Sequence, residues 1–70
     1  MGQYFSRRET ECIFLIAQGL TTAKVAERLQ VAKRTVENYL ENARLKANCE
    51  NRVELVTFFL KRDENLLAIV

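Results

Sequence analysis

The sequence has 70 residues and contains no proline, no histidine and no tryptophan, and it has only two glycines and two cysteines. Without proline, no residue breaks a helix by lacking a backbone amide, so helix is the expected state for most of the chain. Without histidine, and with Cys12 and Cys49 far apart, no zinc site can be assembled. We therefore expect two reduced thiols, no metal and no cofactor.

The residues that usually carry catalysis are also scarce. The chain has a single aspartate, Asp63, and no glycine-rich loop. Glu9 and Glu11 are two positions apart, so on a helix they point in different directions and do not form a catalytic carboxylate pair. They are better explained as a helix-cap partner and an ion pair. The sequence thus predicts a protein that is not an enzyme.

Long apolar runs are missing as well. The longest, Cys12–Ala17, has six residues, which is far below the length of a membrane span. No signal peptide is visible, so a cytoplasmic protein is expected. The length predicts one domain, 1–70, with its core at about 5–61. The net charge of +2 is weak evidence for a nucleic-acid partner, but basic residues gather locally between Lys33 and Lys46.

Helix signals divide the chain into four parts, which predicts an all-α, four-helix fold. Ser6 and Glu9 form a capping box for a helix from about Arg7 to Gln18, and Gly19 supplies a left-handed stop. Thr21 or Thr22 caps a second helix that runs to about Leu29. After a short turn, a third helix runs from about Lys33 to Ala47, with Asn48 as a plausible cap. Asn51, with Glu54, starts a fourth from about Arg52 to Lys61. Residues 63–70 either extend a helix or dock on a neighbour.

The second and third segments together carry the clearest functional signal. Thr22–Leu40 is a short helix, a tight turn and a second helix whose first turn carries Lys33, Arg34 and Thr35. This is a helix-turn-helix, the arrangement that places one helix in the DNA major groove.

The chain from Phe5 to Phe59 resembles the DNA-binding domain of the LuxR/GerE/FixJ family of bacterial transcription regulators. The matching residues keep one order and spacing without a gap. They are Phe5-Ser6-x-Arg8-Glu9-x-Glu11, Ala17-x-Gly19-Leu20-Thr21, Val25-Ala26-x-x-Leu29-x-Val31, Arg34-Thr35-Val36-x-Asn38-Tyr39-Leu40-x-Asn42, Lys46 and Asn51-Arg52-x-Glu54.

The resemblance implies a third helix in the major groove and a fourth helix that mediates dimerisation. Carried over position by position, the residues that face the bases are Arg34, Glu37, Asn38 and Glu41. The phosphate-contacting positions are Thr21, Thr22, Lys24, Thr35 and Lys46, and Lys33 joins them as a cation at the start of the third helix.

Side-chain chemistry supports part of this assignment. Arg34 can make a bidentate contact to guanine and Asn38 one to adenine, and the two are four residues apart on one helix face. Phosphates favour lysines, hydroxyls and helix N-termini, which Thr22, Lys33 and Lys46 can provide.

Several positions depart from the family pattern. Family members often carry lysine where this chain has Glu37 and Glu41. These acids either narrow specificity, by accepting from a cytosine amino group, or weaken binding by repelling phosphate. On the helix surface they can also pair with Lys33 and Arg44. Ala32 lacks a capping side chain, and Gln30 is expected to need a positive φ in the turn.

The fourth segment has more apolar residues than one core can absorb. Leu55, Val56 and Phe59 suit the interior by spacing, which leaves Val53, Phe58 and Leu60 as a predicted homodimer interface. The expected function is sequence-specific binding of duplex DNA as a dimer, regulating transcription by recruiting or blocking RNA polymerase.

Two alternatives stay open. One is a promoter-reading part of a sigma factor, which uses a similar helix-turn-helix. The other is a protein-interaction module that keeps the fold without binding DNA. The acids Glu37 and Glu41, and exposed-looking Phe14 and Phe58, favour the second alternative.

Overall fold

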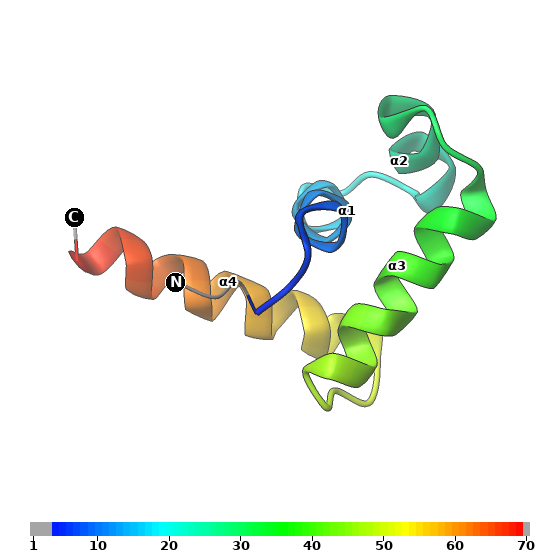
Figure 1. Ribbon diagram of the computed structural model, residues 1–70. Coiled ribbons are helices and arrows are strands. Elements are labelled where there is room, and N and C mark those ends of the chain that lie inside the picture. Colours follow the sequence, from blue (N-terminus) through cyan, green and yellow to red (C-terminus); the bar gives the residue numbers. More distant parts are fainter. Residues whose placement is uncertain (1–3, 70) are drawn as a thin grey trace.

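In the computed structural model the described backbone covers residues 4–69, and the described side chains cover residues 4–62. Within that backbone the chain forms four helices and no strand: α1 (Arg7–Ala17), α2 (Thr22–Leu29), α3 (Lys33–Lys46) and α4 (Arg52–Ile69). The all-α prediction is confirmed, and the first three helices agree with the sequence prediction to within a residue. Figure 1 shows α2 and α3 as a bent pair beside α1, with α4 crossing below.

Local side chains start the helices as predicted. Ser6 Oγ accepts from the Glu9 amide and the Glu9 carboxylate accepts from the Ser6 amide, so the capping box is complete. Thr21 caps α2 by accepting from the Lys24 amide. Ala32 offers α3 no side-chain cap, as the sequence predicted. Asn51 Oδ1 accepts from the Glu54 amide at the start of α4.

The first three helices end with the same backbone hydrogen bonds. After α1 the Leu20 amide donates a hydrogen bond to the Leu15 carbonyl, five positions earlier. Gly19, just before Leu20, has a φ of +99°. Gln30 after α2 and Asn48 after α3 take the same left-handed conformation, with φ values of +60° and +57°. The positive φ predicted for Gln30 is therefore confirmed.

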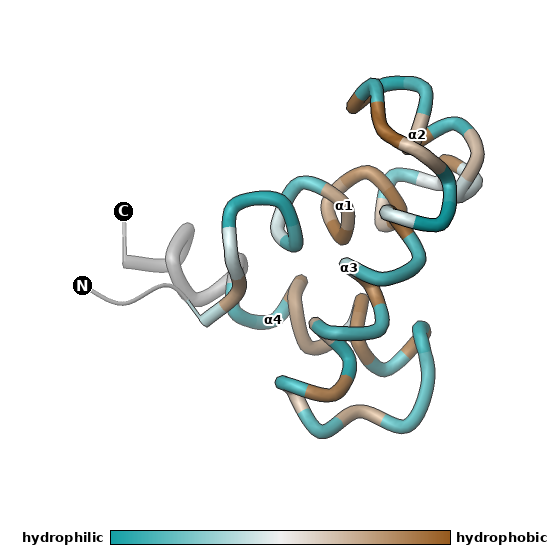
Figure 2. The backbone as a smooth tube through the Cα atoms, turned by 45° about the vertical axis from the view of Figure 1, so that its right-hand side comes forward, coloured by the Kyte–Doolittle hydropathy of each residue, from teal (hydrophilic) through white to brown (hydrophobic). Residues whose placement is uncertain are grey.

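The core lies where the four helices meet. It is made of Phe5 and side chains from all four helices, each nearly inaccessible to solvent: Cys12, Ile13, Leu15, Val25, Ala26, Val36, Leu40, Ala43 and Leu55. In Figure 2 each helix alternates between apolar and polar segments, as expected for helices with one face in a core.

The fourth helix is longer than predicted. It continues past Lys61 to Ile69 because the sequence Asp63–Ile69 contains neither glycine nor proline to end it. Of the two alternatives for the end of the chain, the helix extension is the one observed, whereas Val70 lies outside the described residues. The outer end of α4 extends away from the other helices (Figure 1). No helix in the described part of the chain combines the length and apolarity needed to cross a membrane.

Candidate nucleic-acid interface

The outward face of α3 carries the four predicted base-reading side chains. Val36, Leu40 and Ala43 turn one side of α3 into the core. Positions on the opposite side are exposed, and they include Arg34, Glu37, Asn38 and Glu41. The helix therefore presents two acids, a guanidinium and an amide together on a surface that the core does not use.

The same face continues into an apolar residue that the sequence reasoning missed. Leu45 follows Glu41 by four positions and is 62% exposed, so it adds an apolar side chain to this face. Its spacing from Arg34, Asn38 and Glu41 was the available signal, since positions three and four apart share a helix face.

The start of α2 is where the predicted phosphate contacts Thr21, Thr22 and Lys24 lie. The Thr21 hydroxyl is occupied as the helix cap, and Lys24 Nζ lies 3.7 Å from Glu27 Oε1 in an exposed pair. Thr22 Oγ1 accepts a hydrogen bond of 3.3 Å from Arg52 Nη1, which comes from the start of α4.

Arg52 is thus brought to the start of α2, although the sequence reasoning gave it no role. The two residues are 30 positions apart, and the contact is made by the long Arg52 side chain, so only the tertiary structure reveals it. Its place in the Asn51-Arg52-x-Glu54 pattern was the only signal in the sequence.

The other predicted phosphate contacts differ in their surroundings. Lys33 and Arg34 are exposed in the first turn of α3, and neither forms an ion pair within residues 4–62. The predicted Lys33–Glu37 pair is therefore wrong for this structure. Thr35 is half-buried beside them.

Lys46 is held by an acid of α1. Its Nζ lies 2.7 Å from Oε1 of Glu9, whose side chain is only 7% exposed. Burial raises the pKa of Glu9, but the hydrogen bonds from Lys46 and Ser6 together lower it by more, so the carboxyl stays ionised. The Tyr4 hydroxyl also donates to the Lys46 carbonyl, at 2.7 Å. Lys46 therefore joins α1 to α3 through this ion pair, independently of its predicted phosphate contact.

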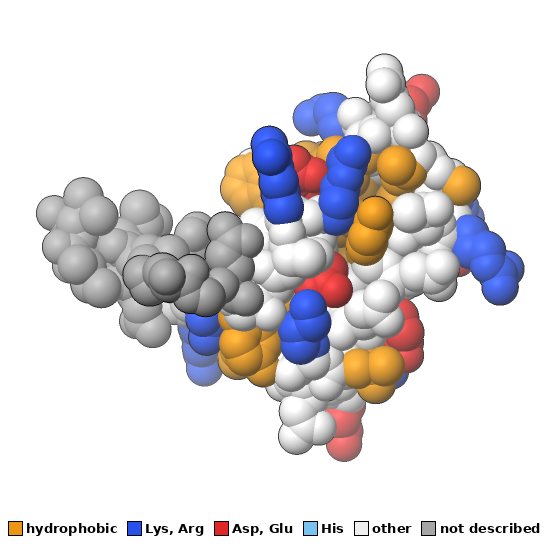
Figure 3. Space-filling view, viewed as in Figure 1, with side chains coloured by type: hydrophobic (Ala, Val, Ile, Leu, Met, Phe, Trp, Pro, Cys, Tyr) orange, Lys and Arg blue, Asp and Glu red, His pale blue; other side chains and the backbone are white. Residues whose placement is uncertain are grey.

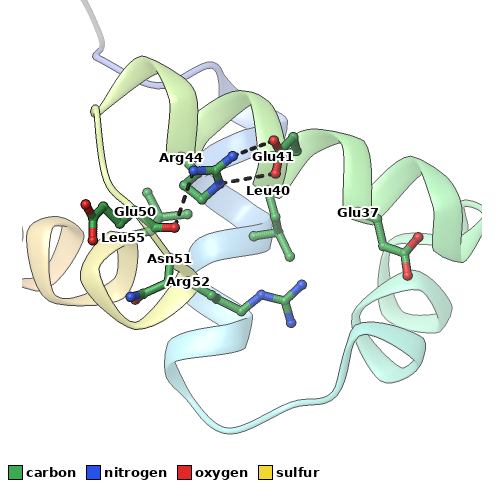
Figure 4. A pocket seen from close by; sticks show the side chains of 8 residues that line it. All are labelled: Glu37, Leu40, Glu41, Arg44, Glu50, Asn51, Arg52 and Leu55. Carbon is green, nitrogen blue, oxygen red and sulfur yellow. Dashed lines mark hydrogen bonds and ion pairs between the residues drawn. The ribbon is translucent and has the colours of Figure 1, made fainter.

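Glu41 is paired as predicted. Arg44 Nη2 lies 2.6 Å from its Oε2, and Arg44 Nε donates to its Oε1 at 3.2 Å. The hydrogen bonds from Arg44 lower the pKa of Glu41. Both residues border a groove of about 260 Å³ between α3 and the start of α4. Figure 4 shows Glu41 and Arg44 turned toward each other, with Glu37 farther along α3.

Basic and acidic side chains are interspersed on the surface. In Figure 3 the Lys and Arg side chains form separated groups on the face shown, with acidic and apolar side chains between them. This pattern agrees with the net charge of +2.

The exposed side of α4 carries two of the three predicted interface residues. Val53 is 74% exposed and Leu60 46% exposed. Phe58 instead lies against the core, with its ring centroid 5.4 Å from that of Tyr4 and 6.0 Å from that of Phe5. The expectation that Phe58 is exposed was therefore wrong, whereas Phe14 on α1 is 47% exposed.

Comparison with known proteins identifies the family. The model of the family described as bacterial regulatory proteins, luxR family, matches residues 3–59. The HTH-type quorum sensing-dependent transcriptional regulator VjbR of Brucella ovis is 45% identical over 49 residues, which are 70% of this chain and 19% of that protein. The oxygen regulatory protein NreC of Staphylococcus carnosus is 39% identical over 57 residues, which are 81% of this chain and 26% of that protein.

The chain thus spans about a fifth to a quarter of the length of these relatives. The family match extends across α1, α2, α3 and the first part of α4, and so includes the helix-turn-helix of α2 and α3. The same match favours the luxR family over a promoter-reading part of a sigma factor. This chain belongs to the luxR family of bacterial regulatory proteins, and its α2 and α3 form a helix-turn-helix.

Proposed function

We propose that this domain binds duplex DNA in a sequence-dependent manner by placing α3 in the major groove. The observation that carries the proposal is the exposed face of α3. There Arg34 and Asn38 lie four residues apart, Arg34 forms no ion pair within the described residues, and Asn38 is equally exposed. Both side chains are suited to bidentate contacts with base edges. Glu37 and Glu41 complete the proposed reading face.

Phosphate contacts would flank this helix. Lys33 is exposed at the start of α3, and Thr21, Thr22 and Lys24 lie at the N-terminus of α2, where backbone amides and the helix dipole favour an anion. Thr35 and Lys46 complete the proposed set. Arg52 adds a guanidinium beside Thr22 that can serve the same phosphate.

The active form would be a homodimer that uses the exposed side of α4, with Val53 and Leu60 at the interface. Phe58 lies five positions after Val53, on another side of α4, and packs on its own core, so it would not contact the partner copy directly. Two copies of α3 would then read half-sites about 34–36 Å apart. Recruiting or blocking RNA polymerase from such a site would regulate transcription.

A mobility-shift titration on a duplex selected from random sequence tests the DNA reading. Replacing Arg34 or Asn38 by alanine should weaken binding to the selected site by about 1–3 kcal/mol, with a smaller loss on random DNA. Lys33→Ala is the matched control for a phosphate contact. This variant should weaken binding to both duplexes by the same factor. It should also reduce the magnitude of the slope of log K against log salt concentration by about 0.9. Equal losses on both duplexes for Arg34→Ala and Asn38→Ala would rule out base reading.

The second candidate function is a protein-interaction module. It is favoured by the two acids on the outward face of α3, which repel phosphate. Failure of the unmodified protein to shift any duplex at low salt would support this candidate instead.

A further inference from the structure

Arg44 makes more polar contacts than any other side chain of α3 within the described residues. On one side it contacts both carboxylate oxygens of Glu41, at 2.6 and 3.2 Å. On the other side its Nη1 donates to the carbonyl oxygens of Cys49, at 2.9 Å, and Glu50, at 3.5 Å. The guanidinium is therefore fixed by the loop between α3 and α4, and it fixes Glu41 in turn.

This arrangement makes the two acids of the α3 face different from each other. Glu41 is tied to a half-buried arginine, whereas Glu37 has no ion pair or side-chain hydrogen bond within residues 4–62. Pairing with Arg44 offsets the negative charge of Glu41, so its repulsion of DNA phosphates is reduced. The pairing also restricts the rotamers of the Glu41 side chain before DNA binds. Less conformational entropy is therefore lost on binding.

The carboxylate keeps capacity to accept further hydrogen bonds. Two carboxylate oxygens have about four lone-pair sites, and the two contacts from Arg44 occupy one on each oxygen. The base edges that donate in the major groove are the amino groups of cytosine and adenine, and the adenine amino group lies beside the N7 acceptor. A fixed carboxylate with two acceptor oxygens therefore suits cytosine and repels the acceptor edges of guanine.

We propose that Arg44 is a positioning residue for DNA recognition, which holds Glu41 as an acceptor for the amino group of a cytosine. This inference rests on the proposed function and adds to it a base preference at one position. The assignment of Arg44 does not require it to touch DNA.

The test is selection of bound duplexes from a randomised pool by the full chain and its variants, followed by measurement of affinity at each base position. The unmodified protein should prefer cytosine at one position in each half-site by about tenfold. Glu41→Gln and Arg44→Met should both lose the preference at that position, and the double variant should lose no more than either single variant. Glu11→Gln is the matched control, because it removes an acid that is also paired with arginine but lies on α1, outside the proposed reading face, and it should keep this preference.

Two results would overturn the inference, in ways that separate it from the proposed function. Absence of any duplex binding by the unmodified protein would remove the proposed function and this inference with it. Binding in which Arg44→Met keeps the cytosine preference, or lowers affinity equally for every sequence, would leave the function intact and make Arg44 a purely structural residue. Glu41→Gln leaves the contacts from Arg44 to the Cys49 and Glu50 carbonyls possible, so its result does not depend on the integrity of the loop.

Discussion

At the scale of single residues, the Glu9 carboxylate has a special position, because it is the one buried charged group within residues 4–62. It accepts from the Ser6 amide at the start of α1 and from Lys46 at the end of α3. A buried charge that loses its partner keeps its desolvation cost, so each partner of Glu9 contributes to stability.

Lys46→Met is therefore expected to destabilise the fold. The methionine retains the length of the side chain but leaves Glu9 without its cation, at a cost of about 1–2 kcal/mol, since Lys46 itself is partly solvated. Chemical denaturation of the two proteins measures the difference. Lys24→Met, which breaks the exposed pair with Glu27, is the control and should cost no more than about 0.5 kcal/mol. Equal losses in the two variants would contradict this role of Lys46.

The same carboxylate predicts a dependence of stability on pH. Because the pKa of Glu9 is lower in the folded state than its ordinary value, the unfolded chain binds more protons in acid. The stabilisation is thus present above about pH 5 and is lost as the pH falls through the folded-state pKa. As the pH falls below about 5, the free energy of unfolding should fall more steeply in the unmodified protein than in Glu9→Gln. Parallel curves would show that Glu9 contributes nothing through its charge.

At the scale of the helices, the residues after α1, α2 and α3 that have a positive φ differ in how well they tolerate it. Gly19 adopts its positive φ without steric cost, but Gln30 has a Cβ that opposes the left-handed conformation. Asparagine tolerates this conformation better than most residues, so Asn48 is the less strained of the two non-glycine cases.

Gln30→Gly should accordingly stabilise the protein by about 1 kcal/mol, because it relieves this strain without removing a described contact of the side chain. Thermal unfolding would show a higher melting temperature for the variant. Asn48→Gly, at the matched position after α3, should give a smaller gain. A loss of stability in Gln30→Gly would mean that the turn between α2 and α3 tolerates glutamine without strain.

At the scale of the whole molecule, the described side chains of α4, residues 52–62, form two kinds of apolar surface. Phe58 and Phe59 pack on the core, where Tyr4, Phe5 and Phe58 form an aromatic cluster and Arg62 lies 4.7 Å above the Tyr4 ring. Val53 and Leu60 remain in solvent, on a helix that extends past the other three. Only the second surface is free to bind another copy of the chain.

We expect Val53→Asp and Leu60→Asp to weaken the proposed homodimer without unfolding the domain. Sedimentation equilibrium at high protein concentration should show association for the unmodified protein and less association for both variants. Asn42→Asp is the control, since it adds the same charge on α3 and removes no apolar surface. Phe58→Asp is unsuitable, because it would place a charge against the core. A monomer that binds a single half-site as tightly as a palindrome would exclude the dimer.

The sequence alone determined the features that depend on neighbours in the chain. Ser6 and Glu9 specify the start of α1, the spacing of Val36, Leu40 and Ala43 specifies the inner face of α3, and these predictions are confirmed. Capping and helix periodicity act within one or two turns, so they can be read from local residues. The end of α4 stayed open between a helix extension and a docked segment, because local residues carry no stop signal there and the choice depends on the rest of the fold.

The contacts that only the tertiary structure decided join residues far apart in the chain. Lys46 meets Glu9 across 37 positions, and Arg52 meets Thr22 across 30. Phe58, which was expected in solvent, is half-buried because the segment at Tyr4 and Phe5 folds onto α4. Helix periodicity states which side chains share a face, but not which other helix covers that face. That depends on how the helices pack, and it is why a charged or aromatic residue on a predicted surface can serve the core instead.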